Sequence, residues 1–393
     1  MAPVHGTPRQ VRNLIGGYRG IRIVPYLTQY LGYATYHFPQ LHHDDLRVLM
    51  VGWELEQLPR RMTEELAGAD IIVAMSDFNA RVFSEAFPRT PVVLAPLLPP
   101  TVHDVVADRR RFGLPEDHTI VLSTFDPISG FDRKNPTAVL DAFTRAFARR
   151  DEATLVFKTQ GLDRVLSRAA DDPEARRAKS FLDRCEQDPR VMLLDQTLPY
   201  ADVQALTASS DIYISLSRAE GFGLPVLEAM SLGIPTVCTE YSGHRDFAHA
   251  DSVAFVHTAE VPVTDDPSQH YRAELFDRTP HWGEADVDHA AHHLRQLADS
   301  PALRAHLGAS GQRQAARYGA SARSAPWVRD LLTHAASTHV TDQHAERHRA
   351  FENFTRLDER DWRNQGEALR RARRSLRLRT ALGRLKSAAV RHR

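Results

Sequence analysis

Short apolar runs alternate along the chain with segments of helical length, and this alternation limits the fold more than any other feature. In the second half these runs are almost continuously apolar and cover residues 118–125, 153–159, 190–195, 211–217, 234–239 and 252–258. Parallel strands covered by helices on both faces have this character, because neither face meets water. Helix-like segments at 135–150 and 200–209 lie between some of them. The pattern predicts a doubly wound parallel sheet with right-handed crossovers.

The first half shows the same alternation in a shorter form. Its predicted strands cover residues 21–27, 46–52, 70–76 and 91–96, with helix-like segments at 58–68 and 77–87. A turn-rich stretch that contains Pro96, Pro99 and Pro100 then separates the two halves. We therefore expect an α/β protein with two Rossmann-like domains that face each other across a cleft. From about residue 284 onward the strands stop, and helices are predicted at 286–299 and 301–318, the second with Ser300 as its N-cap.

The composition agrees with two globular domains. The chain has 393 residues, enough for two cores, and 25% of them are charged. No run of about 18 apolar residues is present, and the first residues lack the apolar stretch of a secretory signal. We therefore expect a cytoplasmic protein, in which Cys185 and Cys238 are buried thiols.

The stretch SRAEGFGLPVLEAMSLGIPTVCTE, residues 217–240, follows a predicted strand and begins a helix. Ligands of doubly wound folds bind at this carboxyl edge of the sheet. Gly221 and Gly223 allow a close approach of the backbone to a ligand, while Pro225 suits the first helical turn and Gly233 ends the helix. The free N–H groups at the helix start favour an anion, most naturally a phosphate.

Two carboxylates flank this loop and complete the prediction. Glu228 falls in the first turn of the predicted helix, where it would hold a vicinal diol such as that of ribose. Glu220 precedes the turn and would point at the group that the phosphates carry. The residues therefore predict a nucleotide-sugar site. The alternative is that both acids merely complement a helix dipole.

Four segments resemble one known family. Glu220 and Glu228, within EGFGLPVLEAMSLGIPTV, resemble the signature of family 4 retaining glycosyltransferases of GT-B fold, the group 1 type. Residues 123–147, STFDPISGFDRKNPTAVLDAFTRAF, resemble the segment after the first strand of that family's donor domain, in its RKNP variant. GWELEQLP with ADIIVAMSDFNARVF, and HWGEADVDHAAHHLRQL at 281–297, are further similarities. The resemblance covers about residues 46–320.

The resemblance implies a role for each matching residue. Lys134 would bind the donor diphosphate and Arg133 would share this work, Glu228 would hold the ribose, and Glu220 would contact the hydroxyls of the donor sugar. The backbone of the loop would line sugar and phosphate, at Gly221, Phe222, Gly223 and Leu224. No metal and no other cofactor is expected, because cationic side chains and the helix start take the metal's place. For Lys134 the alternative is a solvated residue before a helix.

The sequence departs from the family in two places. The family's Gly-Arg pair is replaced by Thr124, Phe125 and Asp126, so Arg133 is the candidate substitute. The N-terminal half is short, and His37 is the one candidate for the histidine that this domain normally supplies, although a structural or surface histidine is its alternative reading. We expect a reduced N-terminal domain at 1–105, a donor domain at 116–280, helices at 281–335 and a basic helical tail at 336–393.

The function that the resemblance implies is transfer of a hexose from a nucleoside-diphosphate sugar to an acceptor hydroxyl, with retention at the anomeric carbon. The RKNP variant points by analogy to mannose and to glycan or surface-polysaccharide biosynthesis, with a glycan or a lipid-linked acceptor. The alternatives are a sugar-nucleotide epimerase of the same fold and a non-catalytic nucleotide-sugar-binding partner of a transferase. The pairs His344/His348 and His289/His293 lack supporting ligands, so no metal site is predicted.

The charge is unevenly distributed along the chain. Residues 370–393 hold nine arginines, Lys386 and no acid, a formal charge of +10, so the other 369 residues sum to −10 for a net charge of zero. Leu378, Leu382, Leu385 and Ala389 would share one helical face. We expect Arg370 to Arg393 to dock on an anionic membrane at its inner face, with an acidic polymer or a solvated helix as the alternatives and no nucleic acid as partner.

Overall fold

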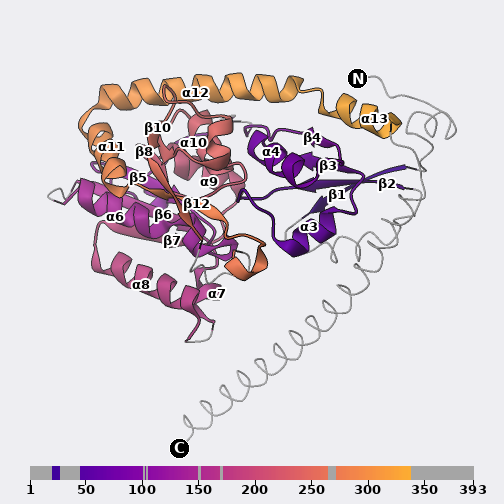
Figure 1. Ribbon diagram of the computed structural model, residues 1–393. Helices are drawn as coiled ribbons and strands as arrows, with labels where there is room; N and C mark the ends of the chain where they lie inside the picture. Colours follow the sequence, from indigo (N-terminus) through magenta and orange to yellow (C-terminus); the bar gives the residue numbers. More distant parts are fainter. Residues whose placement is uncertain are drawn as a thin grey trace, which may run out of the picture. The chain divides into compact units, whose positions relative to one another are not determined.

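The computed structural model describes residues 20–26, 45–100, 102, 105–148, 152–168, 171–263 and 271–337. The chain divides into two compact units (Figure 1). One unit contains the described residues within 1–51, 64–72 and 331–393, and the other contains the described residues within 52–63 and 73–330. His37 and the basic tail, Arg370 to Arg393, lie outside the described residues.

The first sheet has four strands in the order β1-β2-β3-β4 among the described residues, with β1 and β2 parallel. The strands are β1 (Gly20–Tyr26), β2 (Asp45–Val51), β3 (Ile71–Ala74) and β4 (Val92–Leu94), and all four lie close to the predicted positions. Helices α3 (Arg60–Leu66) and α4 (Asp77–Ala86) precede and follow β3. The side chain of Ser76 caps α4 by accepting a hydrogen bond from the backbone N–H of Asn79.

The second sheet is the predicted doubly wound sheet. Its order is β10-β9-β8-β5-β6-β7, and every neighbouring pair is parallel. The strands are β5 (Thr119–Thr124), β6 (Ala153–Thr159), β7 (Val191–Asp195), β8 (Ile212–Ser215), β9 (Thr236–Thr239) and β10 (Ala254–Val256). The order reverses between β5 and β8, so the two crossovers leave a switch point at the carboxyl ends of these two strands.

Successive residues of these strands belong to two different cores, which is why the sequence reads as continuously apolar. Val121 and Ile214 face one core with helices α6 (Pro136–Ala146), α8 (Pro173–Gln187) and α11 (Val287–Asp299). Leu122 and Tyr213 face the other core with helices α9 (Tyr200–Ala208) and α10 (Leu224–Ser231). Both faces of the sheet are therefore covered, as Figure 1 shows.

Short elements complete this unit. One-turn or two-turn helices are α5 (Phe131–Lys134) and α7 (Leu162–Leu166), and 3-10 turns are η1 (Arg110–Phe112), η2 (Pro127–Ser129), η3 (Ser242–Asp246) and η4 (Ala273–Leu275). Phe181 of α8 packs edge-on against Phe125, Phe131 and Phe157, and thereby joins α8 to α5 and to the sheet.

The two helices predicted after residue 284 are present, and the predicted N-cap of the second is confirmed. Ser300 caps α12 (Pro301–Ser324), and Pro301 is its first residue; the helix ends six residues beyond the predicted position. Helix α13 (Trp327–Ser337) follows. Before α11, β12 (His281–Ala285) is a strand that pairs antiparallel with β11 (Thr258–Pro262). This hairpin was not among the strands predicted from the sequence.

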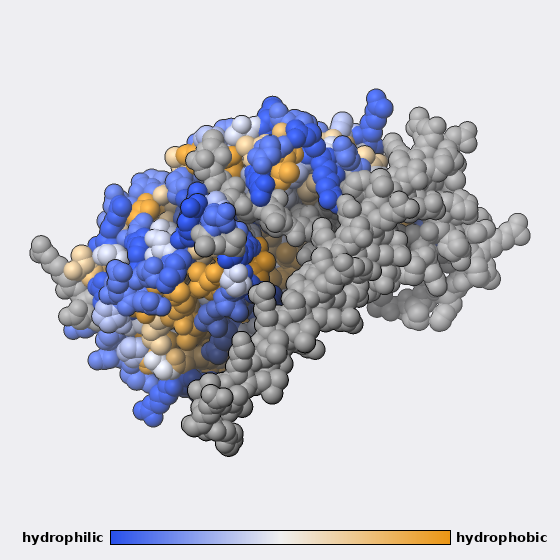
Figure 2. All heavy atoms as spheres, turned by 90° about the horizontal axis from the view of Figure 1, so that it is seen from below, coloured by the Kyte–Doolittle hydropathy of each residue, from blue (hydrophilic) through white to orange (hydrophobic). Residues whose placement is uncertain are grey.

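On the face drawn in Figure 2, hydrophilic side chains surround several apolar patches of the described residues. Within the described ranges, none of the helices combines the length and the apolar character that a membrane span requires. Cys185 and Cys238 are buried free thiols, as predicted.

Candidate functional site

The glycine-rich loop lies at the carboxyl end of β8, beside the switch point of the sheet. Gly223, with φ 96°, is the N-cap residue of α10, and Pro225 occupies the first turn. Gly233, with φ 75°, follows the C-cap residue of this helix. Only glycine adopts these left-handed angles without strain, so the sequence fixes both ends of α10. The helix therefore presents its N-terminal N–H groups at the edge where ligands bind.

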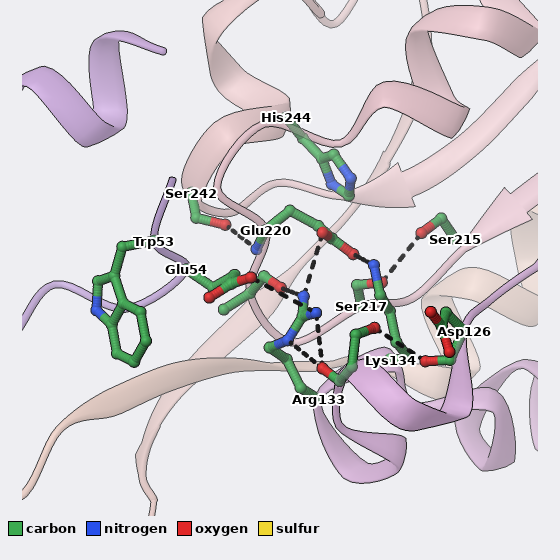
Figure 3. A network of polar contacts seen from close by, with 12 residues as sticks. Trp53, Glu54, Asp126, Arg133, Lys134, Ser215, Ser217, Glu220, Ser242 and His244 are labelled. Atoms are coloured by element: carbon green, nitrogen blue, oxygen red, sulfur yellow. Dashed lines mark hydrogen bonds and ion pairs between the residues drawn. The ribbon is translucent and has the colours of Figure 1, made fainter. Parts of the chain in front are cut away.

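A tight double turn brings two cations to this loop. Gly130, with φ 102°, begins α5, and Asn135, with φ 50°, ends it and begins α6. The single helical turn between them holds Arg133 and Lys134. Figure 3 shows both side chains directed at Glu220, which precedes the glycine-rich loop. The structure thus brings together three of the predicted site residues.

Arg133 supports the segment that precedes the glycine-rich loop, through hydrogen bonds to Ala219 and Glu220. Its side chain is only 2% exposed, and the guanidinium donates hydrogen bonds to the backbone oxygens of Ser129 and Ala219, at 2.9 and 2.8 Å. It also donates to the Oε2 atom of Glu220 at 3.1 Å. Burial alone would lower the pKa of Arg133, but Tyr271, Glu220 and Glu54 more than offset this and raise it. Arg133 is therefore a permanent positive charge that fixes the position of Glu220.

Lys134 and Glu220 form the central ion pair. Nζ of Lys134 lies 2.6 Å from Oε1 of Glu220, and both side chains are largely buried. Burial would raise the pKa of Glu220, but Lys134 and Arg133 hold it well below its usual range. Glu220 is therefore ionised near neutral pH. One carboxylate oxygen contacts each cation, Oε2 at Arg133 and Oε1 at Lys134.

Glu54 and Tyr271 add a second carboxylate and an aromatic ring that the sequence did not reveal. Oε1 of Glu54 lies 3.7 Å from Nη2 of Arg133, and Oε2 accepts a hydrogen bond from the Tyr271 hydroxyl at 3.1 Å. The Tyr271 ring stacks near the Arg133 guanidinium, and Trp53 packs against Tyr271. GWELEQLP was noted only as a family similarity; its position directly after a predicted strand was the available signal for Glu54.

Glu228 lies apart from the ion-pair cluster. It is the fifth residue of α10, so the prediction that it lies in the first turn was wrong. The helix starts at Leu224, one residue before Pro225, and this shifts Glu228 into the second turn. Its Oε1 atom accepts a hydrogen bond from the Tyr200 hydroxyl at 2.6 Å, and burial raises its pKa. Tyr200 is 52% exposed and begins α9, immediately after the loop at residues 196–199.

The remaining loop residues differ in their surroundings. Phe222 is buried against Phe247, so its side chain belongs to the core and only its backbone is free to line a ligand. Leu224 is 38% exposed. A Cβ on Gly221 would lie 2.8 Å from the backbone oxygen of Trp53, so glycine is required there by close packing.

His244 is a further residue that the sequence did not single out. It follows β9 in η3, is 1% exposed, and its imidazole lies beside the Glu220 carboxylate (Figure 3). The hydroxyl oxygen of Ser242, in the same turn, accepts a hydrogen bond from the backbone N–H of Glu220 at 2.8 Å. The turn thus holds the backbone of Glu220 while His244 faces its side chain.

A cavity of about 370 Å³ lies beside α5 and α8, and Arg133, Lys134 and Glu220 are not among its lining residues. Its three arginines are each paired with a carboxylate: Arg177 with Asp132, Arg184 with Asp141 and Arg218 with Glu284. It therefore offers no unneutralised cation to an anionic ligand. In the part of the chain that the structure describes, no group of three or more His, Cys, Asp or Glu side chains is arranged to hold a metal ion.

Comparison with known proteins finds a family that the segment containing Arg133, Lys134 and Glu220 resembles. Residues 108–260 match the model of the family "Glycosyl transferases group 1". A GDP-mannose-dependent monoacylated alpha-(1-6)-phosphatidylinositol monomannoside mannosyltransferase of Corynebacterium glutamicum is 24% identical over 279 residues. The alignment covers 67% of this chain and 62% of that protein, so the chain spans less than two thirds of this relative's length.

Solved structures show the fold. Sucrose-phosphate synthase of Thermosynechococcus elongatus matches with a TM-score of 0.54 and 17% identity, over 80% of this chain and 74% of that chain. HepE of Anabaena, solved in complex with UDP and glucose, matches with a TM-score of 0.54 and 15% identity, over 79% and 77%. The fold is GT-B, as the sequence predicted, and the family match supports the group 1 glycosyltransferase superfamily.

Proposed function

Because residues 108–260 match group 1 glycosyl transferases, we propose that the chain transfers a hexose from a nucleoside-diphosphate sugar to an acceptor hydroxyl. The observation that supports this most is the meeting of Lys134, Arg133 and Glu220 at the start of α10. Cations and a helix N-terminus suit a diphosphate, and the carboxylate suits sugar hydroxyls.

In the proposed reaction Lys134 binds the diphosphate and stabilises the negative charge that grows on it as the glycosidic bond breaks. Arg133 keeps Glu220 in place, and Glu220 accepts hydrogen bonds from the sugar. Glu228, oriented by Tyr200, holds the ribose diol. The backbone of Gly221, Phe222, Gly223 and Leu224 lines the sugar and the phosphates. We propose that these cations and the N-terminus of α10 serve in place of a metal, so EDTA is expected to leave turnover unchanged.

We further propose family 4 membership of the RKNP variant, with retention at the anomeric carbon by attack on the face that the leaving phosphate occupies. The relative from Corynebacterium glutamicum makes GDP-mannose the first donor to test. We propose a glycan or lipid-linked acceptor in glycan or surface-polysaccharide biosynthesis. The basic tail would then dock the enzyme on the inner membrane face, where such an acceptor is found.

The test begins with thermal shifts of the full chain in UDP, GDP, ADP and dTDP, since a bound nucleotide raises the melting temperature by mass action. The matching sugar nucleotide is then incubated with and without acceptor, and the products are analysed by chromatography and NMR. A retained glycosidic product supports the proposal. Free sugar without acceptor would indicate an epimerase-type activity, and nucleotide binding without any turnover would indicate a non-catalytic partner.

A further inference from the structure

One ring nitrogen of His244 has a hydrogen-bond partner among the described residues, and the other has none. Nδ1 lies 3.1 Å from the backbone oxygen of Thr239, and because a carbonyl only accepts, Nδ1 carries the proton. Nε2 is buried and has no hydrogen-bond partner among the described residues. A buried, unpaired nitrogen costs free energy, so it is unusual in a structural histidine.

The unpaired nitrogen points at the start of α10. A Cβ placed on Gly223 would lie 2.7 Å from Nε2 of His244, so the imidazole edge lies directly against the N-cap residue of that helix. Glu220 and Lys134 are the charged groups that act on His244, and Thr239 and the Phe247 ring complete its surroundings within the described ranges. Nε2 therefore lies at the place where the proposed function puts the diphosphate.

The charged side chains of the cluster already neutralise one another, so they would leave the charge of a bound diphosphate uncompensated. The cluster holds two cations, Arg133 and Lys134, and two carboxylates, Glu220 and Glu54. Its formal charge is +2 − 2 = 0 while His244 is neutral, and burial lowers the pKa of His244 and favours that neutral form. A diphosphate adds at least two negative charges to a site with low access to water. The nearest group able to become positive is His244.

We propose that His244 is a diphosphate-binding residue, which takes up a proton from solvent when a nucleoside diphosphate binds and donates a hydrogen bond from Nε2 to a phosphate oxygen. This inference rests on the proposed function. Both ring nitrogens then act as donors, Nδ1 to Thr239 and Nε2 to the phosphate, and the net charge of the cluster becomes +1. The proton leaves again with the diphosphate, so binding and protonation are linked.

The experiment is isothermal titration of the full chain with UDP or GDP, whichever gives the larger thermal shift. It is run at about pH 7.5, above the second phosphate pKa near 6, so the nucleotide itself takes up little proton. Heats measured in two buffers of different ionisation enthalpy give the number of protons bound. His244→Asn removes the titrating group and keeps a side-chain amide that donates a hydrogen bond. His293→Asn is the matched control. His293 lies in α11, and its Nε2 atom already donates a hydrogen bond to the backbone carbonyl of Phe255, so it is not available to a phosphate.

We expect wild type and His293→Asn to take up about one proton more per nucleotide than His244→Asn, which binds about tenfold or more weakly. Equal proton uptake in wild type and His244→Asn overturns the inference while the proposed function stands. Failure of every nucleotide to bind wild type overturns both. If His244→Asn does not fold, His244→Gln replaces it, and zero uptake by wild type is alone sufficient to overturn the inference.

Discussion

At the scale of single residues, Lys134 is the side chain whose removal should affect binding and turnover together. Lys134→Ala removes a charge-assisted contact to a diphosphate that is present in the ground state and more charged during transfer. We expect nucleotide affinity to fall by about 10- to 100-fold, the equivalent of roughly 1.5–3 kcal/mol, and kcat to fall as well. Calorimetry and steady-state kinetics measure the two effects. The exposed Lys179 of α8 provides the control Lys179→Ala; unchanged kcat at saturating donor in Lys134→Ala would contradict a transition-state role.

Glu220 should separate binding from turnover. Its carboxylate pairs with both Lys134 and Arg133, so under the proposed function it would compete with the diphosphate for Lys134. Glu220→Gln is therefore expected to bind the nucleoside diphosphate as tightly as wild type or more tightly, while kcat falls by about 10- to 100-fold. Titration with the nucleotide and kinetics with the nucleotide sugar test this. A variant that keeps full turnover would show that Glu220 does not contact the sugar.

Glu228 should act on nucleotide binding alone. Glu228→Ala removes the proposed acceptor of the ribose hydroxyls, and we expect a loss of about 1.5–3 kcal/mol in binding free energy. Tyr200→Phe leaves the carboxylate but removes its hydrogen bond, so a smaller loss is expected. Binding of a deoxyribonucleoside diphosphate that lacks the diol provides the control, since it should be insensitive to both changes. Equal affinity of wild type and Glu228→Ala for the ribonucleotide would refute this role.

At the scale of elements, the cap of α12 offers a test of stability that does not involve the site. Ser300 accepts a hydrogen bond from the backbone N–H of Leu303. Ser300→Ala is expected to destabilise the protein by about 1 kcal/mol and to lower the melting temperature. Ser321 is exposed within the same helix, so Ser321→Ala should be neutral. A Ser300→Ala variant with the melting temperature of wild type would show that α12 does not depend on this cap.

Some strands and helix ends could be predicted from the sequence, and others could not. The central strands β5, β6, β8 and β9 were predictable because both faces are buried, and residues such as Val121 and Leu122 must be apolar whichever core they meet. Helix ends at Ser300 and Gly233 were predictable because each requires a specific residue type. The hairpin of β11 and β12 was not, since its strands are short and half exposed. Glu54 and His244 were not singled out because their contacts join segments far apart in the sequence.

At the scale of the whole molecule, the segregated charge of the tail predicts reversible, salt-sensitive docking on anionic lipid, at about 1 kcal/mol per basic residue near the surface. The full chain should sediment with anionic liposomes and be released by salt, whereas a chain that ends at Ala368 should remain in the supernatant. Neutral liposomes are the control. Equal sedimentation of both chains, or equal binding to neutral liposomes, would contradict electrostatic docking.

The pairing of Glu220 with Lys134 has a consequence for the end of the reaction cycle. The carboxylate is part of the protein, so it acts as a tethered competitor whose effective concentration at the lysine is far above that of a free anion. Under the proposed function, the sugar hydroxyls would release Glu220 after transfer, and its carboxylate would pair again with Lys134 as the nucleoside diphosphate departs. Such an exchange lowers the barrier to product release. We therefore expect weak product inhibition, together with poor capture of inorganic phosphate by the empty site.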